Sequence, residues 1–198
     1  MAKNIRISSP LNGKLVPLNS INDPVFASGA MGRGVAVQNP KGQVFSPFDG
    51  EITVFFDTYH AIGLKSDDGI DVLIHVGMDT VQLKGKHFTP KKNQGDKVKA
   101  GELLLEFNEP AIKADGYDTT TPVVVTNAAE YGEITVTLGD KSITSQNAET
   151  TDEGSDAPAA AATTGGASDL AAEVAAEEQK YASLPHEQRV AKLIEKYV

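Results

Sequence analysis

The sequence predicts an all-β fold, namely an antiparallel β-sandwich or barrel of the duplicated hybrid motif type. First, short runs rich in β-branched residues alternate with glycine, proline and Asx turns throughout residues 4–140, a spacing typical of a sandwich or barrel and not of a βαβ fold. Second, helical periodicity is almost absent before residue 168. The apolar runs expected to form strands are 5–7, 35–37, 52–56, 72–74, 103–107, 123–125 and 134–138.

A short internal repeat indicates that part of this fold is duplicated. The phrase S-P-L-N-G-K-L at 9–15 returns as S-P-F-D-G-E-I at 46–52. Each copy combines a proline of fixed φ, an Asx-Gly turn and the first apolar residue of a strand. We therefore expect a duplicated strand-turn-strand unit, with hairpins at Asn12-Gly13 and Asp49-Gly50.

Composition divides the 198 residues into three parts. Residues 1–144 carry the strand pattern and have the length of one compact domain. Residues 145–167 contain no aromatic residue and no Leu, Ile or Val. Such a segment buries too little apolar surface to offset its chain entropy, so we expect a flexible Ala/Thr/Gly-rich linker. Residues 168–198 are expected to form a short helical tail.

Two helices are predicted within this tail. Ser168 and Asp169 have the character of an N-cap and first turn, for a helix that continues to about residue 181. A second, amphipathic helix follows, because apolar residues recur at i, i+3, i+4 and i+7; these are Val190, Leu193, Ile194 and Tyr197. This stripe has to dock either on the β-domain itself or on a separate partner. The segment could also be the first helix of a downstream domain or a tether to a membrane subunit.

Overall composition excludes several classes of function. The absence of cysteine removes disulfides, thiol nucleophiles and Cys-ligated zinc. The net charge of −9 argues against a nucleic-acid partner. No apolar run approaches the roughly 20 residues of a membrane span, and the first residues lack the apolar region of a signal peptide. We therefore expect a cytoplasmic protein without direct membrane insertion.

Two histidines are the main candidates for chemistry. His60 and His75 belong to neighbouring predicted strands, which an Asp-Gly turn signal at 66–69 joins in a hairpin. If the hairpin is centred on residues 67 and 68, positions that sum to 135 lie opposite one another, which makes the two imidazoles cross-strand neighbours. Each could simply be a hydrogen-bonded side chain at a strand end. Alternatively, one neutral imidazole is a nucleophile for a phosphoryl group and the other donates to the phosphate oxygens.

Longer phrases around these histidines resemble a known family. They are T-Y-H-A-I-G-L-K-S-D-D-G from Thr58, H-V-G-M-D-T-V-Q-L-K-G-K-H-F from His75, and T-P-V-V-V-T-N from Thr121. In these phrases, and over roughly residues 5–142, the chain resembles the glucose-type enzyme IIA of the bacterial sugar phosphotransferase system. The resemblance does not extend to residues beyond 145.

The resemblance implies a phosphocarrier. His75 would accept a phosphoryl group from the histidine-containing phosphocarrier protein and pass it to a cysteine of an enzyme IIB domain during sugar uptake. His60 would be the supporting imidazole, Thr58 would orient it, and the carbonyl of Gly77 would hold the ring of His75. No cofactor would be required, and the choice of sugar would rest with the membrane subunit.

The resemblance also implies a docking surface for partner proteins. An apolar rim around the histidines would consist of Val25, Phe26, Phe56, Leu73 and Val81. For Phe56 and Leu73, ordinary core packing explains the residue nearly as well. Asp79 is either a cap at the end of its strand or a partner for an arginine of the incoming carrier, and we favour the second.

Two other classes of function were weighed. A lysostaphin-type zinc peptidase has the same kind of β-sandwich and an H-x-x-x-D pair, which His75 and Asp79 match, but the expected downstream H-x-H is missing. Adventitious zinc between His60 and His75 is conceivable, given a carboxylate from elsewhere. A IIA-like regulatory module that binds transporters without carrying phosphate is the other alternative.

Overall fold

The computed structural model describes residues 3–146 together with Lys180, Gln188 and Lys192. Within this part of the chain, strands dominate and helices are short. The strands are β1 (Lys3–Ser8), β2 (Lys14–Pro17), β3 (Arg33–Gln38), β4 (Gln43–Phe45), β5 (Gly50–Phe55), β6 (Ala61–Ser66), β7 (Asp71–His75), β8 (Phe88–Pro90), β9 (Lys97–Val98), β10 (Leu103–Phe107), β11 (Thr121–Val125), β12 (Tyr131–Leu138) and β13 (Lys141–Gln146). The helices are α1 (Pro24–Ala27), α2 (Glu109–Ala114) and the 3-10 turns η1 (Leu18–Ser20), η2 (Thr80–Leu83) and η3 (Ala128–Glu130).

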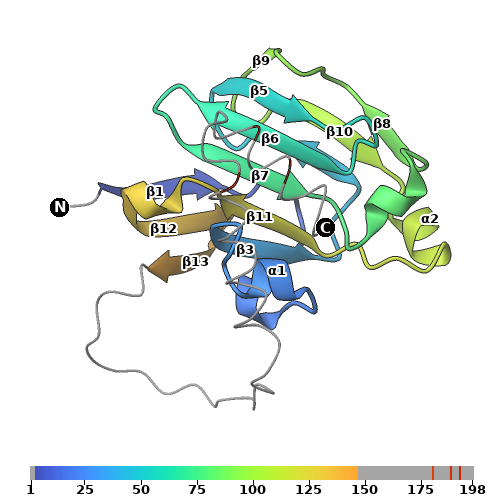
Figure 1. Ribbon diagram of the computed structural model, residues 1–198, viewed down its shortest axis with the longest axis horizontal. Coiled ribbons are helices and arrows are strands. Elements are labelled where there is room, and N and C mark those ends of the chain that lie inside the picture. The colour runs from blue at the N-terminus through green and yellow to red at the C-terminus, as the bar shows by residue number, and fades with distance from the viewer. Residues whose placement is uncertain (1–2, 147–179, 181–187, 189–191, 193–198) are drawn as a thin grey trace.

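These strands form three sheets (Figure 1). The largest has seven strands in the order β2-β3-β11-β7-β6-β5-β9, and two three-stranded sheets have the orders β4-β10-β8 and β1-β12-β13. Neighbouring strands are antiparallel except for β1 and β12, which are parallel. The predicted all-β fold is confirmed, as packed open sheets and not as a closed barrel in the described part of the chain.

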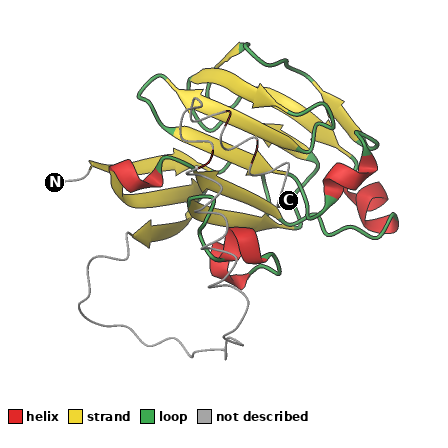
Figure 2. Cartoon of the chain, viewed as in Figure 1, coloured by secondary structure: helices red, strands yellow, loops and turns green. Residues whose placement is uncertain are grey.

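The two faces of the seven-stranded sheet bury different clusters of apolar side chains. On β7, Val72 and Ile74 belong to the main core, which also includes residues of the two smaller sheets. Leu73 points to the other face, where it joins a second cluster with residues from β2, η1, α1, β3, β6 and β11. The described helices lie at the margins of the sheet, with α1 beside β3 and α2 near β8 and β10 (Figure 2). We call this second face the site face, because His75 follows Leu73 by two residues and therefore shares it.

Six of the seven predicted strand runs lie within observed strands, and the run 52–56 extends one residue past the end of β5 at Phe55. The sequence reasoning missed the shortest strands and both helices, because four to six residues are too few to display a helical period. Local capping nevertheless explains α1. The carboxylate of Asp23 accepts hydrogen bonds from the backbone N–H groups of Val25 and Phe26, and Pro24 occupies the first turn.

The predicted hairpins at the two repeats are wrong. β1 pairs with β12 and not with β2, and β4 pairs with β10 and not with β5. The Asx-Gly turns redirect the chain from one sheet to another instead of reversing it within a sheet. The repeats are still locally alike, since the hydroxyl of Ser9 donates to the carbonyl of Leu11 at 2.8 Å and that of Ser46 to the carbonyl of Phe48 at 2.6 Å.

The side chain of Arg33 joins the large sheet to a smaller one through hydrogen bonds. Arg33, the first residue of β3, donates to the carbonyls of Ala128, Tyr131 and Gly132 around the start of β12 and to the carbonyl of Ser145 in β13. A charged donor with four backbone acceptors satisfies carbonyls at a sheet junction that would otherwise need water.

The linker and tail predictions lie mostly outside the described residues. β13 runs to Gln146, two residues past the predicted boundary at 144, while the predicted helices at 168–181 and around 190–197 are described only at Lys180, Gln188 and Lys192, which are helical and exposed. In the described part, no helix is long and apolar enough to cross a membrane.

Candidate functional site

His60 and His75 meet at one end of the β6–β7 hairpin, but in a register that differs by one residue from the prediction. Ala61, not His60, is the partner of His75. The loop between the strands has three residues, 67–69, with Gly69 at φ +88°, and Ser66 and Ile70 flank it. A three-residue loop with a left-handed glycine is a common hairpin type. The assumption of a two-residue turn therefore produced the wrong register.

The two imidazoles are nevertheless in contact. Their ring centroids are 4.9 Å apart and the planes make an angle of 78°. His60 immediately precedes β6, after Tyr59 at φ +57°. A left-handed residue before the strand breaks the strict alternation of side chains. His60 can therefore face the ring of His75, although it is not the strand partner of His75. The backbone stays tied to β7, because the N–H of Val76 donates to the carbonyl of His60 at 2.7 Å.

The protonation of His75 follows from its hydrogen bond. Its Nδ1 lies 2.8 Å from the carbonyl oxygen of Gly77. A carbonyl only accepts, so Nδ1 carries the hydrogen and, in the neutral ring, Nε2 has the free lone pair. This Nε2 is buried and has no hydrogen-bond partner among the described residues. A buried polar atom without a partner is costly and is often explained by function.

Gly77 holds its carbonyl in place because the loop around it is tightly packed. It has φ +80°, and a Cβ added there would lie 2.5 Å from a side-chain carbon of Thr80 and 2.7 Å from the carbonyl oxygen of Asp118. The buried hydroxyl of Thr80 donates to the carbonyl of Val76, and the N–H of Met78 donates to the carbonyl of Asp118. A residue with a side chain would therefore have to displace the loop that orients His75.

His60 is held by its own neighbour. The Thr58 hydroxyl lies 2.5 Å from His60 Nδ1. If the hydroxyl donates, Nδ1 is the acceptor and Nε2 carries the hydrogen. His60 Nε2, like that of His75, is buried without a partner in the described part of the chain. The pair can thus present one lone pair and one N–H to the same small group.

Burial keeps both rings neutral. His60 is 1% exposed and His75 0%. Burial lowers the pKa of His60 to about 4. It lowers the pKa of His75 to about 3, with the neighbouring His60 as a further cause. Because both values lie far below neutral pH, both rings are uncharged there, which is the state a nitrogen nucleophile needs.

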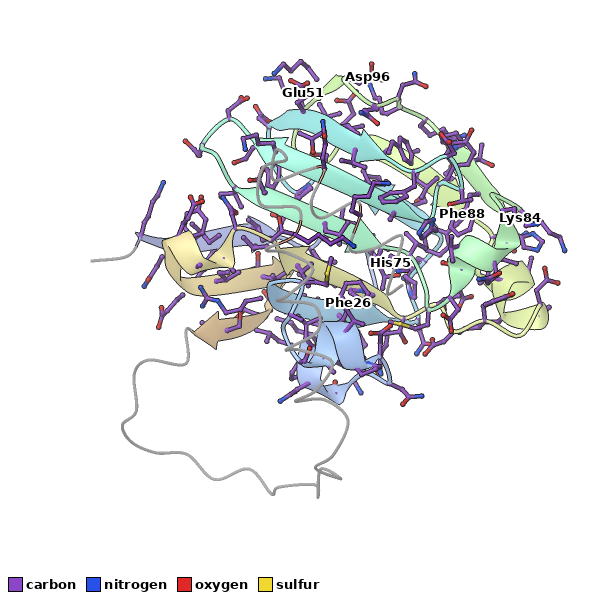
Figure 3. All side chains as sticks on the ribbon, in the orientation of Figure 1. Phe26, Glu51, His75, Lys84, Phe88 and Asp96 are labelled. Carbon is purple, nitrogen blue, oxygen red and sulfur yellow. The ribbon has the colours of Figure 1, made fainter. Side chains whose placement is uncertain are left out.

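Two aromatic residues of the expected apolar rim pack directly on the histidine pair. Phe26 packs on His75 with ring centroids 5.4 Å apart, and Phe56 packs on His60 at 5.2 Å. Figure 3 shows His75 at the end of β7 with Phe26 of α1 beside it. Of the five residues expected to form an apolar rim, Val25, Phe26 and Leu73 are buried, whereas Phe56 and Val81 are partly exposed. The sequence showed that these residues are apolar, but it did not show that three of them are buried.

Asp79 is exposed at the outer side of the site. It has φ +56° at the start of η2 and its carboxylate makes no cap hydrogen bond. The capping role that the sequence left open is therefore absent. Its charge is near Asp23 at the start of α1, where burial raises the pKa of the Asp23 carboxyl with a smaller contribution from Asp79.

In the part of the chain that the structure describes, no group of three or more His, Cys, Asp or Glu side chains is placed to hold a metal ion. His87 lies outside the pair; its side chain is 18% exposed and its Nε2 lies 2.8 Å from a carboxylate oxygen of Asp115. Sequence reasoning also missed the supporting roles of Thr80 and Asp118, which no local motif marks.

The fold and the site together define an all-β domain with two facing neutral imidazoles at the end of one hairpin, an arrangement that suits a nucleophilic ring nitrogen with a second group beside it. Residues 5–131 match the family described as "phosphoenolpyruvate-dependent sugar phosphotransferase system, EIIA 1", and the chain belongs to this family.

Curated relatives of this chain include long EIIBCA components and shorter EIIA components. The chain is 49% identical over 131 residues to the PTS system beta-glucoside-specific EIIBCA component of Halalkalibacterium halodurans, covering 66% of this chain and 21% of that protein. It is 39% identical over 132 residues to the PTS system glucose-specific EIIA component of Oceanobacillus iheyensis, covering 67% of this chain and 80% of that protein. The chain thus spans only about a fifth of the EIIBCA relatives.

A solved structure has the same fold. The glucose permease IIA from Mycoplasma capricolum is 30% identical, with a TM-score of 0.57 over 60% of this chain and 77% of that one. This similarity agrees with the family assignment.

Proposed function

We propose that this chain is a phosphocarrier of the bacterial sugar phosphotransferase system, working in the cytoplasm. His75 accepts a phosphoryl group from the histidine-containing phosphocarrier protein and passes it to a cysteine of an enzyme IIB domain during sugar uptake. The observation that carries the proposal is the fixed tautomer of His75, whose Nδ1–H is held by the Gly77 carbonyl while Nε2 keeps its lone pair.

The chemistry needs few protein groups. The lone pair of His75 Nε2 forms the new N–P bond as the P–N bond to the donor histidine breaks, and the electron pair of that bond returns to the donor ring. In the second transfer a cysteine thiolate attacks phosphorus and the lone pair returns to Nε2. His60, with Thr58 donating to its Nδ1, offers its Nε2–H to a phosphate oxygen. Positioning and charge stabilisation of this kind account for most catalysis of phosphoryl transfer.

The residues around the histidine pair are assigned to the recognition of partner proteins. The EIIBCA names of the relatives support an enzyme IIB partner, and this chain has no cysteine of its own to receive the phosphoryl group. We assign Asp79 to pair with a basic residue of the incoming carrier, because its carboxylate is exposed and is not used as a cap. The partner proteins make apolar contacts with the rim around the pair, which consists of Val25, Phe26, Phe56, Leu73 and Val81.

The test is phosphorylation with enzyme I, the phosphocarrier protein and phosphoenolpyruvate, followed by mass mapping of the modified peptide. We expect one acid-labile phosphate on His75 and none in His75→Gln. His60→Gln should accept phosphate but pass it on poorly. His87→Gln, which changes a histidine outside the pair, serves as the matched control and should behave as wild type. Phosphate on another side chain of the wild-type protein would refute the assignment.

A further inference from the structure

Tyr59 stands between Thr58 and His60 with a left-handed backbone. Its φ is +57°, a conformation that glycine and asparagine adopt readily and a bulky side chain rarely does. Residues in such strained conformations persist where the surrounding structure determines them, and they are concentrated at functional sites. Contacts of the tyrosine ring therefore have to hold the backbone of residue 59 in this conformation.

The ring of Tyr59 is held on the main-core side of the large sheet. It packs against the main cluster of buried side chains. It also meets Phe55, the last residue of β5, edge-on, with ring centroids 5.7 Å apart and planes at 74°. A second neighbour is Gly85, since a Cβ added there would lie 3.5 and 3.7 Å from two ring carbons of Tyr59. One strand residue and one loop residue thus fix the ring.

Two aromatic pairs support the turn between β5 and β6 from opposite faces of the sheet. The turn is closed by the N–H of Tyr59, which donates to the carbonyl of Phe56 at 2.8 Å. Phe55 and Tyr59 form one pair and pack against the main core. Phe56 and His60 form the other, with ring centroids 5.2 Å apart, and Phe56 packs against the cluster of the site face. The ring of Tyr59 therefore anchors the turn on one face immediately before His60 emerges on the other.

His60 reaches His75 because residue 59 redirects the chain. The next residue, Ala61, belongs to the cluster of the site face, so His60 and Ala61 share one face although they are consecutive. In a regular strand their side chains would alternate, and His60 would point away from His75. The same bend leaves the hydroxyl of Thr58 2.5 Å from Nδ1 of His60. The orientation of His60 thus depends on the backbone conformation that the ring of Tyr59 maintains.

The loop that contacts Tyr59 also orients His75. Gly85 follows η2 and belongs to the segment that begins at Gly77, whose carbonyl oxygen lies 2.8 Å from Nδ1 of His75. One short segment therefore contacts the supports of both imidazoles, whose ring centroids are 4.9 Å apart. Tyr59 is the residue through which this segment reaches the His60 side of the pair.

We propose that Tyr59 is a positioning residue for phosphoryl transfer, whose ring acts through His60. Packing on Phe55 and Gly85 holds residue 59 left-handed, and this conformation aims the Nε2–H of His60 at the oxygens of a phosphoryl group on His75. The inference rests on the proposed function. Because accepting a phosphoryl group needs the lone pair of His75 and not His60, Tyr59 matters most in the second transfer, to the cysteine thiolate of an enzyme IIB domain.

The test compares two substitutions at this position. Tyr59→Phe keeps the aromatic ring and is the matched control, whereas Tyr59→Gly removes the ring and leaves the backbone free to adopt other conformations. Each protein is phosphorylated on His75 and mixed with an excess of a purified enzyme IIB domain in single-turnover assays. At saturating IIB domain, transfer from Tyr59→Gly should be about tenfold slower, with an unchanged half-saturating concentration. Tyr59→Phe should transfer at the wild-type rate.

A double-mutant comparison shows whether Tyr59 acts through His60. In a His60→Gln background, Tyr59→Gly should slow the second transfer by less than about twofold, because the group that the ring positions is already gone. A full tenfold loss in that background would overturn the proposal. Wild-type transfer by Tyr59→Gly would overturn it as well, and so would an equal loss in Tyr59→Phe, which would assign the effect to the hydroxyl.

A second variant leaves residue 59 unchanged. Phe55→Leu removes the ring that meets Tyr59 edge-on, and it should slow the second transfer about threefold while phosphorylation of His75 stays at the wild-type rate. Urea unfolding of each variant identifies any protein that is not folded under the assay conditions. A folded Phe55→Leu protein with an unchanged second transfer would count against the role of the ring.

Imidazole ¹⁵N NMR separates this inference from the proposed function, because it needs no phosphoryl group. In wild type and Tyr59→Phe, His60 should show one tautomer with the hydrogen on Nε2, whereas Tyr59→Gly should show a mixture of tautomers. These spectra without phosphorylation of His75 in any protein would support the orientation of His60 by Tyr59 and refute the phosphocarrier. Phosphorylation of His75 with identical spectra and transfer rates in all variants would refute the role of Tyr59 and leave the phosphocarrier intact.

Discussion

Burial of the neutral histidine pair should make the stability of the fold depend on pH in a specific direction. In the unfolded chain an imidazole has a pKa of about 6.5, whereas burial lowers that of His75 to about 3. Between these values the unfolded state binds a proton that the folded state does not. Above pH 6.5, His75 is neutral in both states and does not reduce the free energy of unfolding. As the pH falls from 6.5 toward 3, proton uptake by the unfolded state progressively lowers that free energy.

The size of the effect follows from the same values. One pH unit corresponds to about 1.4 kcal/mol for one proton, so lowering the pH from 7 to 5 should cost roughly 2 kcal/mol through His75 alone. His60, whose pKa is lowered to about 4 for the same reason, adds a comparable amount. His75→Gln cannot take up this proton, so its free energy of unfolding should fall by roughly 2 kcal/mol less over the same interval.

The measurement is urea unfolding of wild type and His75→Gln at pH 8, 7, 6 and 5. Exposed carboxylates titrate in both proteins, so the difference between the two curves isolates the histidine. That difference should be constant from pH 8 to 7 and should shrink below pH 6.5. Parallel curves down to pH 5 would show that His75 takes up a proton in the folded protein as easily as in the unfolded one, and would refute the burial argument.

Three further substitutions test other parts of the structure. Gly77→Ala should lower the free energy of unfolding by about 1–3 kcal/mol in urea titrations and slow phosphorylation of His75, because the added methyl displaces the loop whose carbonyl holds the ring; wild-type rates with unchanged stability would contradict this. Thr58→Val, similar in shape, should leave phosphorylation of His75 intact but slow its transfer to an enzyme IIB domain about tenfold in single-turnover assays, since His60 loses its orienting hydroxyl; an unaffected second transfer would exclude that role. Arg33→Met should lower the free energy of unfolding by about 2–4 kcal/mol without changing the site of phosphorylation, because four backbone carbonyls lose their charged donor.

Much of the fold was predictable because strands and turns leave local signals. Each predicted apolar run coincides with a strand, with only the run 52–56 ending one residue past β5, and Gly69 marked the right hairpin. The register was wrong by one residue, since turn length depends on backbone angles that the Asp-Asp-Gly letters do not specify. The hairpins expected at Asn12-Gly13 and Asp49-Gly50 were wrong because a turn sequence does not say which strand the returning chain will pair with.

The sequence by itself determined that two histidines fifteen residues apart meet at the end of one hairpin, and that apolar residues such as Phe26 and Leu73 accompany them. Only the tertiary structure decided which nitrogen of His75 is free and that the pair is buried. The first depends on the Gly77 carbonyl, whose position is set by contacts with the distant Asp118. The second depends on what packs over the sheet. Tautomer and burial are properties of surroundings assembled from remote parts of the chain, so no local pattern specifies them.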